Sequence, residues 1–154
     1  MKMNTAISTA LIAVSLAATP TLALAVDSDP SPPVNNDHAA GKSAIDAKDW
    51  NGAIKHLTAA AQRDSRNADI QNLLGYAYRN AGQLDPAFKH YERALQLNPR
   101  HRGAREYMGE AYLMANNLPK AEEQLAALET MCPRVCEERD DLKKSIERYR
   151  VSKK

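Results

Sequence analysis

Apolar and polar positions alternate with a helical period along most of this chain. The stretch IQNLLGYAYRNAG has apolar residues at spacings of three and four, which places them on one side of a helix. A turn rich in Asn, Gly and Asp follows, and a second apolar-periodic stretch, AFKHYERALQL, ends before Pro99. From about Asn36 onward the pattern predicts pairs of helices joined by tight turns.

The helical pattern repeats with a period of 34 residues, which is first visible in Gly41, Gly75 and Gly109. The ungapped blocks are 34–67, 68–101 and 102–135. Other columns that align are Ala53, Ala87 and Ala121; Leu57, Tyr91 and Leu125; and Ala44, Tyr78 and Tyr112. A glycine inside a helix costs roughly 1 kcal/mol relative to alanine, so the glycine column predicts close helix packing. One block cannot bury its apolar side alone, whereas stacked blocks form a continuous core.

The middle block resembles the tetratricopeptide repeat family. The residues that carry the resemblance are Leu74, Gly75, Tyr78, Ala87, Tyr91, Ala94 and Pro99. The chain departs from the family where tryptophan is common, because that column holds Asp37, Gln71 and Arg105. The resemblance implies an all-α helical-repeat solenoid: three helix-turn-helix pairs over residues 35–135, a capping helix at 136–150, and about seven helices in total.

The N-terminal segment has the pattern of a secretory signal peptide. Lys2 precedes a short apolar stretch, and Ala23-Leu24-Ala25 supplies the small residues of a cleavage site. The apolar stretch is shorter than the ~20 residues that span a bilayer. We therefore expect a signal peptide at 1–25, a Pro-rich linker at 26–34, export to the bacterial periplasm, and no membrane insertion after cleavage.

Charge and motifs give little sign of catalysis or nucleic-acid binding. The chain has 21 Lys and Arg against 19 Asp and Glu, and so lacks the basic excess typical of nucleic-acid binding. Catalytic patterns such as G-x-S-x-G and H-E-x-x-H are absent, and the four histidines have no metal-ligand spacing. We expect no enzyme, no cofactor and no metal.

The resemblance also implies a site. In tetratricopeptide proteins the first helix of each repeat lines a concave groove that holds a peptide or helix of a partner. Carried over by repeat column, the groove residues are His38, Lys42, Asn72, Tyr76, Arg79, Glu106, Glu110, Leu113 and Met114. The acidic Glu106 and Glu110 stand where a carboxylate clamp needs a base, which argues against binding of chaperone tails. The implied function is a periplasmic protein-interaction scaffold of unknown partner, with self-association as a further option.

The only two cysteines, Cys132 and Cys136, stand on either side of Pro133, which shares a column with Pro99. The first cysteine then ends one helix and the second begins the capping helix across a turn short enough for a disulfide. Export would favour oxidation. A structural disulfide is the favoured interpretation, and two alternatives stay open: a redox or Cu(I)-handling accessory protein using this pair, or free thiols.

Overall fold

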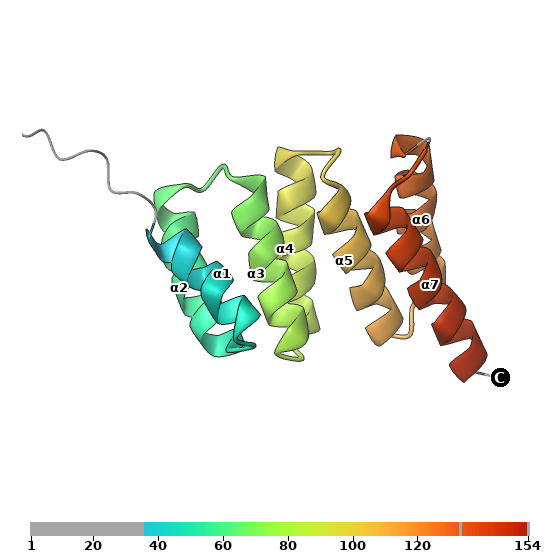
Figure 1. The fold of residues 1–154 in the computed structure, drawn as a ribbon, viewed down its shortest axis with the longest axis horizontal. Helices are drawn as coiled ribbons and strands as arrows, with labels where there is room; N and C mark the ends of the chain where they lie inside the picture. The colour runs from blue at the N-terminus through green and yellow to red at the C-terminus, as the bar shows by residue number, and fades with distance from the viewer. Residues whose placement is uncertain (1–35, 133, 154) are drawn as a thin grey trace, which may run out of the picture. The chain divides into compact units, whose positions relative to one another are not determined.

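A computed structural model of the chain describes residues 36–132 and 134–153. The described residues form seven α-helices and no strands. The helices are α1 (Asn36–Asp46), α2 (Trp50–Arg63), α3 (Ala68–Asn80), α4 (Leu84–Leu97), α5 (Arg102–Met114), α6 (Leu118–Met131) and α7 (Glu137–Ser152). They follow one another side by side in chain order (Figure 1). The expected all-α helical repeat is confirmed.

Several sequence predictions fall on residues outside this range. The signal peptide at 1–25, the linker at 26–34 and the position of Pro133 lie outside the described residues. Within the described ranges, no helix combines the length and the apolar character needed to cross a membrane.

The turn between the two helices of a repeat uses one backbone conformation at one repeat column. Lys48, Gly82 and Asn116 are 34 residues apart, and all three have positive φ, at 57°, 77° and 57°. This left-handed conformation is easiest for glycine and tolerable for asparagine. The next residue in each turn donates its N–H to the helix before it: Asp49 to Ala44 O at 2.8 Å, Gln83 to Tyr78 O at 2.9 Å and Asn117 to Tyr112 O at 2.8 Å. The backbone conformation of the turn therefore repeats every 34 residues, as the sequence does.

The glycine column marks where helices approach most closely. A Cβ atom placed on Gly75 would lie 2.5 Å from a ring carbon of Tyr91, and one on Gly41 would lie 2.6 Å from Leu57. Tyr91 and Leu57 are both fully buried on the second helix of the same repeat. Glycine is needed at these positions because any side chain would push the two helices apart.

The third repeat breaks this pattern. A Cβ atom on Gly109 would meet Leu142 of α7 at 2.6 Å. Leu125, the column equivalent of Tyr91, stays partly exposed at the edge of the core. Leu142 and Ile146 of α7 are buried in this last apolar cluster. The final helix thus fills the contact that the second helix makes in the earlier repeats.

The glycine contact predicts opposite effects of one alanine substitution at two sites. Gly75→Ala should lower the free energy of unfolding by about 1–3 kcal/mol, because the fully buried Tyr91 ring must move. Gly103→Ala is the matched control, since its Cβ atom would meet nothing closer than 3.5 Å. There the higher helix propensity of alanine should raise stability by up to roughly 1 kcal/mol. Chemical denaturation measures both, and equal effects would refute the packing role of Gly75.

Candidate functional site: the inner surface of the repeats

One side of the array is lined by the first helices of the repeats. α1 contacts α3, α3 contacts α5 and α5 contacts α7, whereas α2, α4 and α6 contact none of one another. Helices that touch on one side and diverge on the other form a curved array, with the touching helices on the inner side. The groove residues expected from the sequence are all on α1, α3 and α5.

A buried arginine and three aromatic rings occupy the middle of the inner surface. The Arg79 guanidinium carbon lies 5.2 Å from the Tyr76 ring centre and 5.4 Å from that of Tyr107. The two tyrosine rings are 4.9 Å apart, and Trp50 packs edge-on against Tyr76 at 6.1 Å. A cation over aromatic faces is attracted by the negative ring face. This cluster joins α2, α3 and α5 through aromatic and cationic contacts.

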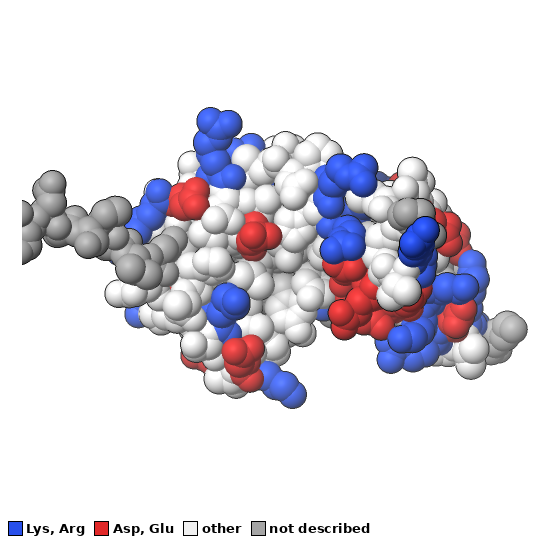
Figure 2. Space-filling model, turned by 45° about the horizontal axis from the view of Figure 1, so that its top comes forward, with Lys and Arg blue, Asp and Glu red and all other residues white. Residues whose placement is uncertain are grey.

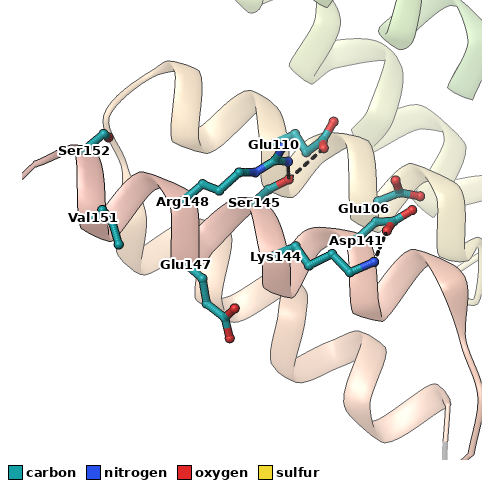
Figure 3. Close-up of a pocket in the computed structure, with 9 residues that line it drawn as sticks. All are labelled: Glu106, Glu110, Asp141, Lys144, Ser145, Glu147, Arg148, Val151 and Ser152. Carbon is teal, nitrogen blue, oxygen red and sulfur yellow. Dashed lines mark hydrogen bonds and ion pairs between the residues drawn. The ribbon is translucent and has the colours of Figure 1, made fainter.

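Glu110 neutralises the buried arginine. The Arg79 side chain, only 9% exposed, forms an ion pair and a hydrogen bond with Glu110. The Ser145 hydroxyl of α7 donates a second hydrogen bond to the Glu110 carboxylate, at 3.1 Å (Figure 3). A buried charge is tolerated only when it is paired and hydrogen-bonded. The pair therefore ties α3, α5 and α7 together.

Glu106 lies one turn before Glu110 and has no such partner. Within the described part of the chain its carboxylate forms no ion pair or hydrogen bond. Burial, together with the nearby carboxylates of Glu110, Asp141 and Glu138, raises the pKa of Glu106 to about 8, although Arg79 opposes this shift. Burial, with Glu106 itself, also raises the pKa of Tyr107 to about 12. The inner surface is therefore acidic towards α7.

The acidic side chains gather around the contact of α5 with α7. Figure 2 shows them as one red area over the C-terminal helices. A hollow of about 730 Å³ opens along these two helices (Figure 3). Its lining is Glu106, Glu110, Asp141, Lys144, Ser145, Glu147, Arg148, Val151 and Ser152. Two basic side chains on α7 line this hollow beside the acids.

Each repeat carries a polar side-chain pair in place of the family's tryptophan. In this column, each of Asp37, Gln71 and Arg105 forms a side-chain hydrogen bond with the residue 19 positions later. The pairs are Asp37 with His56 at 3.5 Å, Gln71 with His90 at 2.8 Å and Arg105 with Gln124 at 3.1 Å. Burial lowers the pKa of His90, whose ring stacks on Tyr78 at 5.3 Å. These contacts give His56 and His90 a structural role between helices.

The structure brings part of the predicted groove together. Tyr76, Arg79, Glu106 and Glu110 belong to the arginine cluster or its acidic border, and Asn72 lies beside Glu106 and is 7% exposed. Met114 ends α5 as an exposed side chain, at 52%. His38 and Lys42 are on α1, half-buried and exposed respectively.

Leu113 occupies a different place from the one expected. It is 9% exposed and packs with Ala121, Leu128, Leu142 and Ile146 in the last apolar cluster. The expectation of a partner contact needs correction for this residue, because neighbouring helix positions point about 100° apart. Met114 points outward where Leu113 points into the core.

Four important residues of the surface were missed. These residues are Trp50, which shares a repeat column with Leu84 and Leu118, and Tyr107, Glu138 and Asp141. A spacing of 31 residues could have found Tyr107, Glu138 and Asp141, which follow Tyr76, Tyr107 and Glu110 by that interval, but not Trp50. Arg79 and Glu110 are 31 apart, as are Tyr76 and Tyr107. Residues that face each other on neighbouring first helices are thus 31 positions apart, about one helical turn less than the 34-residue repeat.

The cysteine pair lies at the junction of α6 and α7. Cys132 caps the end of α6 and Cys136 precedes α7. Their Cα atoms are 5.7 Å apart and their sulfur atoms are in direct contact. Both are buried, at 5% and 2% exposed. Arg139 of α7 donates to the Cys132 carbonyl at 3.0 Å, which fastens the same junction.

The raised pKa of Glu106 predicts a pH-dependent effect of its removal. Between the ordinary value of 4.5 and the folded value of about 8, the folded protein holds a proton that the unfolded chain has released. Stability contributed by Glu106 therefore falls as the pH rises through this window. Relative to wild type, Glu106→Gln should gain thermal stability between about pH 5 and about pH 8.5. Glu129→Gln, on the exposed face of α6, controls for loss of one charge; a gain that does not change with pH would contradict the burial of Glu106.

Comparison with known proteins places this geometry in a family. Residues 68–101 match the tetratricopeptide repeat family. No curated protein sequence matches the chain. Among solved structures, the TPR2B domain of yeast Sti1 in its complex with pHsp70 is 18% identical, covers 76% of this chain and 95% of its own, and has a TM-score of 0.70.

Two further structures agree. The Sgt2 TPR domain of Aspergillus fumigatus is 21% identical with a TM-score of 0.70, and covers 80% of both chains. The Yersinia enterocolitica type III secretion chaperone SycD, in complex with a peptide of the translocator YopD, is 16% identical with a TM-score of 0.69, and covers 80% of this chain and 97% of its own. Residues 68–101 are therefore a tetratricopeptide repeat, set in a chain that has the fold of a tetratricopeptide-repeat domain.

Proposed function

We propose that the chain is a protein-interaction module whose inner surface binds a peptide or helix of a partner protein. The observation that carries this proposal is the row of partly exposed aromatic rings on the inner surface, namely Trp50 of α2, Tyr76 of α3 and Tyr107 of α5. Aromatic side chains with an apolar body and a polar tip are enriched at protein interfaces. The complexes of two structurally similar proteins, the Sti1 TPR2B domain with pHsp70 and SycD with a YopD peptide, support this function.

The buried polar contacts make the surface ready for binding. Arg79 is fixed by Glu110 and by two tyrosine rings, and Ser145 fixes Glu110 in turn. A surface held rigid before binding loses little conformational entropy when a partner arrives. Met114 lies one helical turn beyond Glu110 and extends the surface with an exposed, adaptable side chain. The proposed function is binding without a catalytic step.

We further propose that the protein acts in the periplasm after removal of residues 1–25, with Cys132 and Cys136 joined as a disulfide. The Cα separation of 5.7 Å lies within the ~4.4–6.8 Å range of disulfides. The bond would hold the start of α7 against the end of α6. Because both cysteines are nearly inaccessible, the structure offers nothing that favours a redox or Cu(I)-handling function.

Site-specific photocrosslinking tests the binding surface without disturbing the core. A photoreactive phenylalanine analogue at Met114 should give protein adducts in the cells that make this chain, because Met114 faces the groove and is exposed. The same analogue at Gln96, exposed on α4 away from the groove, is the matched control and should give few adducts. Equal crosslinking at the two positions would contradict a partner site on the inner surface.

Intact-mass analysis tests export and oxidation together. Protein purified from the periplasm without reductant should lack residues 1–25 and be lighter by two hydrogens. Iodoacetamide should modify Cys132 and Cys136 only after unfolding and reduction. Retention of the N-terminal segment would refute the processing, and alkylation of the unfolded chain before reduction would refute the disulfide.

A further inference from the structure

A second, smaller pocket lies where α3, α5 and α7 meet on the inner surface. It has a volume of about 290 Å³. Its lining is Asn72, Gly103, Glu106, Tyr107, Glu137, Glu138 and Asp141. Four of these seven residues are acids and none is Lys or Arg. The pocket is therefore a cluster of hydrogen-bond acceptors beside an aromatic ring.

The carboxylates of this pocket are only partly neutralised. Glu138 lies 3.4 Å from Arg102, and Asp141 lies 3.1 Å from Lys144. The two basic side chains are 52% and 68% exposed, so these are surface ion pairs of small energy. Glu106 has no ion pair in the described ranges. Several carboxylate oxygens thus remain available to a ligand.

Asn72 supplies an independent sign of a missing partner. Its residue is 7% exposed, and its Oδ1 atom is buried without any hydrogen bond. A buried amide oxygen left without a donor costs about 1–3 kcal/mol, and such groups are rare in folded proteins. Because Asn72 lines the pocket, a donor bound there would lie beside this amide and the carboxylates.

We propose that this pocket binds an arginine side chain of the partner segment. This inference rests on the proposed binding function, and it adds that the partner segment carries a positively charged side chain. Among the described residues, no group of three or more His, Cys, Asp or Glu could hold a metal ion. Acceptors from three helices match the five N–H donors of a guanidinium better than the compact ammonium of lysine.

The neighbouring cluster shows that this surface already accommodates a guanidinium. Arg79 meets Tyr107 and Glu110 with the same combination of aromatic face and carboxylate that the pocket offers through Tyr107 and Glu106. Arg79 satisfies Glu110, whereas Glu138 and Asp141 of α7, a second set of acids, are paired only with the exposed side chains of Arg102 and Lys144. The partner's arginine would complete this second set.

A short peptide pair isolates the guanidinium in the test. Acetyl-Gly-Arg-Gly-amide is titrated into the ¹⁵N-labelled protein, with the citrulline peptide as an uncharged probe of the same shape and a lysine peptide as the second cation. Saturable shifts of the Asn72 side-chain amide are expected with arginine, weaker ones with lysine, and none with citrulline. Equal response to citrulline, or no saturable shift at Asn72, would overturn the pocket; equal response to lysine would overturn the choice of arginine.

Matched variants separate this site from general attraction to acidic protein. Glu138→Gln with Asp141→Asn removes two carboxylates that line the pocket and should weaken arginine binding about tenfold. Glu92→Gln with Glu129→Gln removes two charges from exposed positions of α4 and α6 and should leave the affinity unchanged. Equal weakening in both variants would overturn the proposal, and the NMR spectra show directly whether each variant is folded.

The two proposals fail in different ways. Crosslinking at Met114 without arginine binding would keep the interaction surface and remove the arginine pocket. Arginine binding at Asn72 with equal crosslinking at Met114 and Gln96 would keep the pocket and remove the groove as the partner site.

Discussion

The buried ion pair of Arg79 with Glu110 is the interaction on which the inner surface depends. A guanidinium that is almost fully buried would be strongly destabilising without a counter-charge. Glu110 supplies it, the rings of Tyr76 and Tyr107 cover it, and Ser145 extends the contact to α7. Because Glu110 compensates Arg79, the remaining acids of α5 and α7 lack a buried partner of their own. One pair therefore sets both the order of the aromatic surface and the acidic character beside it.

Much of the fold could be predicted from the sequence because each repeat solves the same local problems with residues at the same column. Gly41 and Gly75 allow the two helices of their repeats to touch. Lys48, Gly82 and Asn116 adopt the turn conformation that reverses the chain. The repeat period, the glycine positions and the turn residues all indicate the same helix pairs. A fold can be predicted from one sequence when such independent signals agree.

The contacts between repeats could not be predicted from the repeat columns. The 34-residue period says which residues are equivalent, whereas neighbouring first helices meet at a spacing of 31 because each repeat is rotated and shifted on the one before. Leu113 was therefore assigned to the surface although it packs in the core. The period also gave no sign that Gly109 would meet Leu142. The charge pattern of α7 likewise gives no sign that its acids lie beside α3 and α5.

A double-mutant cycle on Arg79→Met and Glu110→Gln tests the central interaction most directly. Each single substitution leaves one partner of a buried pair uncompensated, and the double substitution removes both charges. The free energies of unfolding should show a coupling of about 1–3 kcal/mol, with the double variant more stable than the sum of the single effects implies. Additive effects would show that the pair does not hold the inner surface together.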